Sequence, residues 1–483
     1  MRFDLGAIQM LDTYGDVISG SVIGSMSESK GASPFAGLET KTKLYVGLSE
    51  LLKQPAFAGV DRVLAGQAEV ELDFNAEAEY PLQLKVVITG LRTRDLPGSS
   101  QDYRLAAQLK QTSGGAYTLG SNLQAGFESR PSTNIKLGCL FYPERQPLPF
   151  KFSLTSSRVS QGDIELLMAS LVTNDTAASA SSSSALAPRA EETKTQRPPW
   201  SDFDGEVSIK VDELVLQSGQ VLTELKAQVK ISEALLSVKD ITATLISGEL
   251  VGDANVAYDP IQNPAYQVAS SFFLKNVDPS LFSKRNYSKF PVQGLFDGQF
   301  KFAGSGHTLE EAAEDSEGDL IITGRNGVLT AFELDSRSQL GLIGAGILGQ
   351  SLNRPGMTAM AQAVPYFKDM KFESFTLQLV RGKDKQVRIP ELKFMGDNLS
   401  INGHGAIAAG NLGEILDQPL YLTLGLGAKG RLVDHLVTLQ LLGTKTSEDG
   451  FRIWNQDIEI RGSLGDPDTS ALKDLLNNAA RRA

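Results

Sequence analysis

Three carboxylates, Glu69, Glu71 and Asp73, come closest in this sequence to a spacing that could do acid–base chemistry. Two carboxylates at a fixed separation are the machinery of glycoside hydrolysis, so this group has to be weighed first. The three acids alternate with apolar residues, and alternate residues of a β-strand share one face of a sheet. We therefore expect a strand over Ala68–Ala76 with one solvated acidic face, where carboxylates need no catalytic role.

Histidine and cysteine are too scarce to form a second kind of site. The three histidines, His307, His404 and His435, lie far apart and none has a partner at metal-ligand spacing. Cys139 is the single cysteine, which excludes an intramolecular disulfide, and a catalytic thiol would need a nearby base. No G-x-S-x-G motif occurs. The sequence therefore predicts a protein that is not an enzyme, with no cofactor, no metal and no catalytic residues.

The run Gly344-Ala345-Gly346-Ile347-Leu348-Gly349 matches the dinucleotide-binding pattern G-x-G-x-x-G. That pattern works only between a strand and a long helix of a βαβ unit, and Pro355-Gly356 follows too soon. We interpret Gln339–Leu352 instead as an apolar helix that packs against a sheet, because small residues recur on one of its faces. The alternative is a helix that dips into a membrane surface or shields a groove.

The elements that must position any site are mostly strands. From Lys371 to about Leu424, apolar and polar residues alternate with turns between the runs, which predicts antiparallel strands in a meander. Other regions show the same period, so the predicted fold is mostly β: an extended antiparallel sheet curled into an open groove. A few short helices accompany it: Leu48–Leu64 interrupted at Pro55, one after Thr308 with capping-box spacing, Met357–Val364, and a C-terminal helix Thr469–Ala480 capped by Asp468.

Four regions follow from composition. Residues 1–173 form a β-rich N-terminal region, and 174–199 are a Ser/Ala/Pro-rich linker or insertion with almost nothing to bury. Residues 200–467 form a second β region, and 468–483 the C-terminal helix. The sequence leaves open whether 174–199 separates two domains or interrupts one sheet.

Charge and hydropathy exclude two classes of function. The net charge of −11 over 483 residues lacks the basic surface that nucleic-acid binding requires. No apolar run reaches the ~20 residues of a membrane helix. The first residues have the composition of a strand interior, from which we expect that a preceding segment is missing from this chain.

The second half resembles a known family. Gly294–Phe300, the turn Gly304-Ser305-Gly306-His307-Thr308, the strand from Gly318 to Ile322 and the closing run Ile458–Pro467 are similar to the C-terminal region of AsmA-like proteins. The match covers about Trp200–Pro467, and it is the order of the motifs that makes it specific. The resemblance implies a periplasmic envelope protein, anchored in the inner membrane by an N-terminal segment that is absent here, and involved in outer-membrane biogenesis and lipid transport between membranes.

An apolar sheet face must be covered by helices, by a second sheet or by an apolar ligand, and this sequence has few helices. We therefore expect an apolar groove that binds or conducts phospholipid or glycolipid, with the inner or outer membrane as partner. The candidate groove residues by parity are Phe296, Phe300, Leu377, Leu379, Ile389, Phe394, Ile401, Leu422 and Leu424. The alternative is a structural or assembly scaffold whose sheet engages other envelope proteins by strand addition. A carbohydrate-active protein would need an aromatic platform, and the two tryptophans lie far apart.

Overall fold

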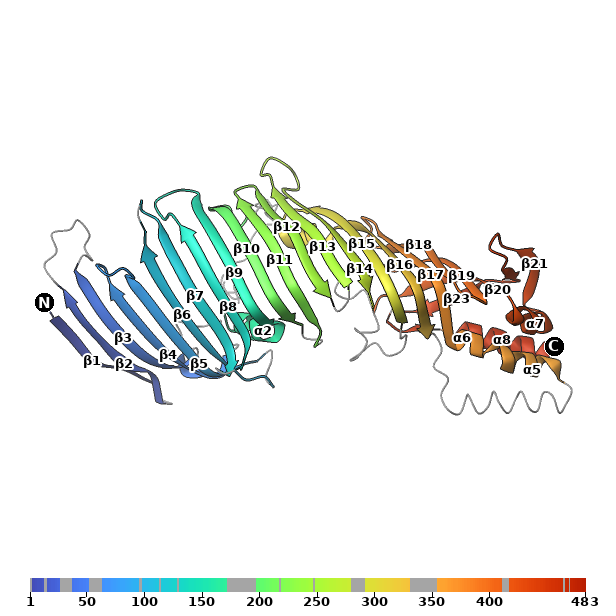
Figure 1. The fold of residues 1–483 in the computed structure, drawn as a ribbon, viewed down its shortest axis with the longest axis horizontal. Coiled ribbons are helices and arrows are strands. Elements are labelled where there is room, and N and C mark those ends of the chain that lie inside the picture. The colour runs from blue at the N-terminus through green and yellow to red at the C-terminus, as the bar shows by residue number, and fades with distance from the viewer. Residues whose placement is uncertain are drawn as a thin grey trace, which may run out of the picture. The chain divides into compact units, whose positions relative to one another are not determined.

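The computed structural model describes most of the chain (Figure 1). The described residues are 2–12, 15–26, 37–51, 63–94, 98–112, 114–127, 130–171, 197–216, 219–245, 248–278, 292–330, 354–410, 417–463, 465–468 and 470–483. They form a mostly β protein with one long, open, mixed sheet and a few short helices, including one at the C-terminus. The predicted fold class is confirmed.

The chain divides into two compact units, Met1–Ala243 (unit 1) and Thr244–Ala483 (unit 2), so the boundary falls inside a strand. The strands of unit 1 are β1 Arg2–Asp12, β2 Gly15–Met26, β3 Leu38–Gly47, β4 Val63–Asn75, β5 Leu82–Thr93, β6 Gln101–Gln111, β7 Tyr117–Phe127, β8 Arg130–Phe141, β9 Leu148–Ser160, β10 Phe203–Val215, β11 Val221–Ser232 and, at the boundary, β12 Leu235–Leu245. From β1 to β9 each strand pairs antiparallel with the next. The β6–β7 turn shows why glycine is needed, because Gly114 and Gly115 have φ of 85° and 76°.

Strands β9 and β10 pair in parallel, from Leu148 opposite Phe203 to Ser160 opposite Val215. The segment 174–199 thus connects two neighbouring strands of one sheet, although most of it lies outside the described residues. This pair also makes the sheet mixed, whereas the alternation in the sequence predicts an antiparallel sheet throughout. A parallel pair leaves no local sequence signal, because it depends on the path of the connection.

Unit 2 continues with strands that are again antiparallel to their neighbours. They are β13 Gly248–Tyr258, β14 Tyr266–Val277, β15 Val292–Gly306, β16 Glu317–Thr330, β17 Asp369–Arg381, β18 Val387–Met395, β19 Leu399–Ile407, β20 Leu420–Ala428, β21 Leu442–Thr446, β22 Arg452–Trp454, β23 Ile458–Gly462 and β24 Pro467–Asp468.

The described helices are short. Unit 1 has α1 Leu48–Leu51 and α2 Gln161–Leu171, and unit 2 has α3 Leu309–Glu314, α5 Pro355–Ala363, α6 Pro365–Lys368, α7 Arg431–Thr438 and α8 Ser470–Arg482. The helix start expected at Thr308 is confirmed: the Glu311 backbone N–H donates to Thr308 Oγ1 at 3.1 Å, while the Glu311 carboxylate accepts from the His307 N–H at 2.8 Å. Asp468 likewise accepts from the Ser470 N–H at 2.9 Å.

Two helix predictions need correction. The helix expected over Leu48–Leu64 is described only to Leu51, and Val63 and Leu64 already belong to β4. The helix expected over Met357–Val364 is present as α5 but begins two residues earlier, at Pro355, because proline lacks only an N–H that is unpaired at a helix start. The helix expected over Gln339–Leu352 lies outside the described residues.

Candidate functional site

One face of the sheet in unit 1 is apolar across nine consecutive strands, β3 to β11. Because cross-strand partners point to the same side, the register assigns residues to this face directly. Three rows run across it: Thr40, Phe74, Leu82, Leu109, Leu119, Cys139, Phe152, Val207, Val229; Thr42, Leu72, Leu84, Ala107, Ser121, Leu137, Leu154, Ile209, Ala227; and Leu44, Val70, Val86, Leu105, Leu123, Ile135, Ser156, Val211, Leu225. We call this surface the apolar face and its opposite the polar face.

The opposite rows are polar and charged. One of them consists of Lys43, Glu71, Lys85, Ala106, Asn122, Lys136, Thr155, Lys210 and Lys226. On the apolar face, Leu72, Leu84 and Leu119 are neither buried nor fully exposed. A leucine in the middle of a sheet remains partly accessible to water only where no second layer covers it. No described element therefore covers the apolar face over β3 to β7, whereas Ile135, Val211 and Ala227 on β8 to β11 are buried.

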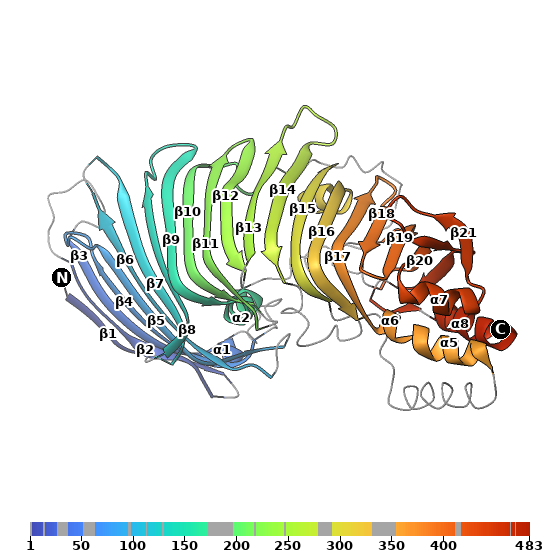
Figure 2. The ribbon, with the colours of Figure 1, turned by 45° about the vertical axis from the view of Figure 1, so that its right-hand side comes forward.

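Two helices close one long edge of the apolar face (Figure 2). Leu166 and Leu167 of α2, with Leu48 of α1, pack against side chains at the strand ends near Val63 and Leu91. Leu166 and Leu91 are each 1% exposed, so this edge is a dry core. We call it the closed edge.

A buried carboxylate fixes α2 at the closed edge. Asp163 is 8% exposed and accepts three side-chain hydrogen bonds, from Gln101 Nε2 (2.8 Å), Ser132 Oγ (2.6 Å) and Thr133 Oγ1 (2.7 Å). Its backbone carbonyl accepts a fourth from the Tyr103 hydroxyl at 2.7 Å. Burial, together with the Asp163 charge, raises the pKa of Tyr103, which keeps this hydroxyl a donor.

Aromatic side chains border the other long edge, where the strands end in turns. Tyr117 and Phe141 stack with ring centroids 5.9 Å apart, and Phe150 meets Phe203 edge-on at 6.1 Å. Register places all four rings on the apolar face. This edge, called the open edge, has no described helix of unit 1 against it.

The nine groove residues expected from the sequence all lie in unit 2 and share one face of its sheet. The cross-strand pairs show this: they continue one face from Leu274 and Val277 on β14 through β15 to β20. Along the way this face includes Phe296, Leu377 and Leu424. The remaining six are Phe300, Leu379, Ile389, Phe394, Ile401 and Leu422.

Exposure divides these nine residues. Ile389, Phe394 and Ile401 are 4%, 1% and 8% exposed, inside a core to which α5, α7 and α8 contribute buried side chains. Phe296, Leu377, Leu379, Leu422 and Leu424 are half-buried at the border of that core. Phe300 is also half-buried, between Phe272 and Leu320 in its row.

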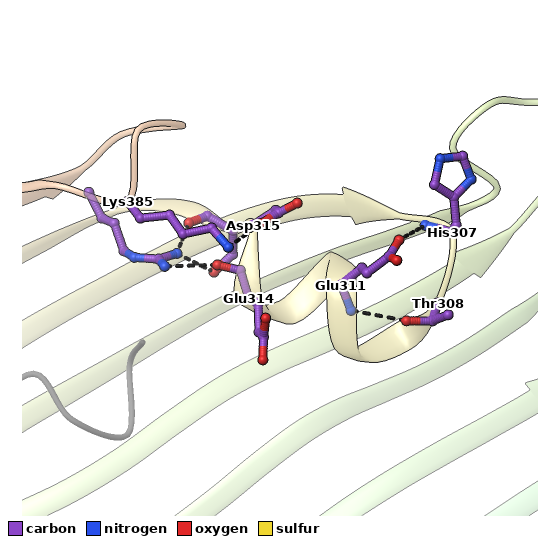
Figure 3. Close-up of polar contacts among 8 residues, drawn as sticks. His307, Thr308, Glu311, Glu314, Asp315 and Lys385 are labelled. Atoms are coloured by element: carbon purple, nitrogen blue, oxygen red, sulfur yellow. Dashed lines mark hydrogen bonds and ion pairs between the residues drawn. The ribbon is translucent and has the colours of Figure 1, made fainter. Parts of the chain in front are cut away.

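A short helix lies over the same face at one edge of unit 2 (Figure 3). Helix α3 crosses β15 so closely that a Cβ on Gly304 would be 2.0 Å from the Ala312 carbonyl. Arg381 of β17, which is 8% exposed, donates to the carbonyls of Ser316 and Glu314, the latter at 2.8 Å. Lys385 adds an ion pair with Asp315 at 2.7 Å.

The three acids that opened the sequence argument lie on the polar face, and two of them, Glu69 and Glu71, form ion pairs. Lys43 Nζ lies 2.6 Å from Glu69 and 2.9 Å from Glu71. The hydrogen bond and charge of Lys43 lower the pKa of Glu71, which disfavours a proton-donor role for this carboxyl. Among the described residues no group of histidine, cysteine, aspartate and glutamate could hold a metal ion. No helix in that part of the chain combines the length and apolar character that crossing a bilayer requires.

Sequence reasoning did not name the apolar face of unit 1 as a candidate site. The signal was present, because Leu82, Leu84 and Val86 alternate as regularly as the residues of β17. The candidate groove residues were all in unit 2 because the family resemblance covered only the second half of the sequence.

The comparisons with known proteins give one result. The model of the AsmA family matches residues 64–362, which is more than half of the chain and includes both units. No curated protein and no solved structure matches the chain.

Proposed function

The chain belongs to the AsmA family of envelope proteins, and we propose that it is a non-enzymatic component of outer-membrane biogenesis that binds lipid acyl chains on its apolar sheet face. Conduction of lipid between membranes, along successive strands, is part of this proposal. So is a periplasmic location. The observation that carries it is the apolar face of unit 1, three rows deep across nine strands, which no described element covers over β3 to β7.

The energetics favour an aliphatic occupant. Each buried methylene contributes about 0.8 kcal/mol, so an acyl chain laid on the rows gains several kcal/mol over many equivalent positions. A surface without built polar contacts holds a chain without fixing its place along the strands. Such a surface suits movement along the sheet better than tight binding at one point.

The two edges suggest how a lipid would lie. The closed edge, sealed by α1 and α2, would receive the ends of acyl chains. The open edge, bordered by Tyr117, Phe141, Phe150 and Phe203, would leave the polar headgroup in water, because aromatic side chains suit the boundary between apolar and aqueous surroundings.

Cys139 offers a reporter without any engineering. It is the single cysteine and lies in the first row of the apolar face, opposite Leu119 and Phe152. A small environment-sensitive fluorophore such as bimane on Cys139 should shift to shorter wavelength when phospholipid is added. Native mass spectrometry of the protein purified without harsh detergent should show co-purified lipid.

The test uses a pair of neighbouring substitutions in β7. Leu119→Asp puts a charge in the apolar face and should abolish both signals, whereas Thr118→Asp puts the same charge on the polar face and should abolish neither. Lipid occupancy that is equal in the two folded variants would refute the proposal. A lipid-free protein that crosslinks to other envelope proteins would favour the scaffold function instead.

A further inference from the structure

The polar face of unit 1 contains a hollow of about 620 Å³ over strands β4 to β8. Its floor is formed by small residues, Ala106 and Gly120, and its polar lining includes Gln108, Asn122 and Lys136. A second hollow of about 260 Å³ on the same face also includes Lys136, together with Asn134. Lys136 thus stands between two adjoining depressions, on the side of the sheet away from the apolar face.

Lys136 has no carboxylate on its own strand or on the two strands beside it; the acids of the two hollows are Glu71 and Asp73 on β4 and Asp212 on β10. Strands β7, β8 and β9 contain no aspartate or glutamate, although the chain has 57 such residues and a net charge of −11. At the far rim of the larger hollow, Glu71 is already paired with Lys43 and Lys85. Lys136 makes no ion pair within the described residues. An unpaired ammonium whose neighbouring strands have no carboxylate favours an anionic partner.

Two amide oxygens beside Lys136 have no hydrogen-bond donor. Asn122 lies directly opposite Lys136 in the ladder, and Asn134 lies two residues before it on the same strand and face. The Oδ1 atoms of Asn122 and Asn134 are both buried and unpaired. A buried acceptor without a donor is costly, and a hydroxyl group of a ligand would supply the missing proton.

We propose that the two adjoining hollows bind a phosphorylated sugar, with the phosphate on Lys136 and the sugar hydroxyls donating to Asn122 in the larger hollow and to Asn134 in the smaller one. A bare phosphate suits the site less well, because its hydroxyl groups sit on the same phosphorus atom that faces Lys136, whereas the hydroxyl groups of a sugar are spread along its ring. The unpaired lysine disfavours a neutral sugar. Binding rests on charge and hydrogen bonds and needs no aromatic platform. The ligand is either a free sugar phosphate or the headgroup of a glycosylated or inositol lipid, and both share this chemistry.

The first experiment titrates the full chain with trehalose 6-phosphate by saturation-transfer NMR, with trehalose and inorganic phosphate as comparators. Binding of trehalose 6-phosphate should be at least about tenfold tighter than that of either comparator, the effect of one good charge-assisted contact. Absence of binding, or equal binding of inorganic phosphate, would overturn the proposal.

Two variants and a matched control locate the site. Lys136→Glu should weaken binding about tenfold or more by reversing the charge. Gly120→Leu should do the same by filling the hollow, since a Cβ there meets nothing closer than the Gln108 side chain at 3.8 Å. Lys226→Glu reverses a charge in the same row, three strands from Lys136, and should change binding less than about twofold. Equal loss in Lys226→Glu and Lys136→Glu would show non-specific attraction and overturn the proposal.

Vesicles separate the two sources of the ligand. If the ligand is a headgroup, the protein should cosediment with phosphatidylinositol vesicles more than with phosphatidylglycerol vesicles of equal charge, and Lys136→Glu should abolish the difference. If it is a free sugar phosphate, the two vesicles should behave alike while trehalose 6-phosphate still binds. Leu119→Asp should leave trehalose 6-phosphate binding unchanged, so this site can stand even where lipid binding to the apolar face fails.

Discussion

Removal of the Asp163 carboxylate should release α2 from the closed edge while the sheet stays folded. In Asp163→Ala, the side chains of Gln101, Ser132 and Thr133 lose the acceptor that they share. A hydrogen bond to a charged group contributes about 1.5–3 kcal/mol, and such bonds are not additive within one network. We therefore expect a loss of roughly 3–4 kcal/mol in the local stability of α2.

The helix should detach on its own because an isolated helix of 11 residues is marginal in water. Its attachment depends on Leu166 and Leu167 and on the Asp163 network. Hydrogen exchange with mass spectrometry measures this directly. A loss of 3–4 kcal/mol corresponds to roughly 100- to 1,000-fold faster exchange of the α2 amides.

Three comparisons make the result decisive. Asp163→Asn keeps one carbonyl oxygen for the two hydroxyl donors, and should cost about 1–2 kcal/mol. Glu165→Ala removes an acid from the same helix that is only partly buried, and should cost less than about 1 kcal/mol. The strands of unit 2 serve as an internal reference. Unchanged exchange of α2 in Asp163→Ala, or equal loss of protection in β13–β16, would refute the reasoning.

Three further predictions follow from other contacts. Arg381→Ala should cost about 2–4 kcal/mol and speed hydrogen exchange in α3, because it removes donors from the buried carbonyl of Ser316 and the part-buried carbonyl of Glu314; Arg381→Lys should restore only part of this protection. Gly324→Val should lower the free energy of unfolding of unit 2 by about 1–3 kcal/mol, because a Cβ there would lie 2.5 Å from the Phe296 ring. Urea unfolding measures this, and an unchanged free energy would show that the ring moves freely. Burial raises the pKa of the Cys139 thiol, so its alkylation by iodoacetamide at pH 7.5 should be slower than that of a free thiol and should become faster as the pH rises. Alkylation at the free-thiol rate would contradict the placement of Cys139 on the apolar face.

Alternation alone predicted which residues share a face of the sheet. Phe375, Leu377 and Leu379 were assigned to one side, and the ladder through β16 and β18 keeps them there. The β-bulge between Gln378 and Val380 shifts the register in the next strand, which local alternation cannot reveal. The bulge places Ile389 and Leu392, three residues apart on β18, on one face, and Gly405 continues that face from Ile389 to Leu422.

Whether an apolar face is covered could not be predicted, because the cover comes from elsewhere in the chain. Phe394 is 1% exposed in a core that includes Leu432 of α7 and Leu472 of α8, both far from it in sequence. Leu84 has the same kind of alternating neighbours, yet it stays partly accessible to water. Long-range packing separates these two outcomes, and a period of two residues carries no information about it.

The same alternation of apolar and polar residues therefore has different outcomes in the two units, depending on what covers the apolar side. In unit 2, helices α5, α7 and α8 turn the apolar rows of β18–β20 into an ordinary core. In unit 1, α1 and α2 seal one edge, and the described residues leave the rows of β3–β7 partly accessible to water. Exposed apolar area costs about 25 cal/mol per Å², so a face of this extent is unfavourable in water, and an apolar occupant would remove that cost. That cost is the physical reason to look for lipid on unit 1 first. The buried residues of unit 2 are part of its hydrophobic core.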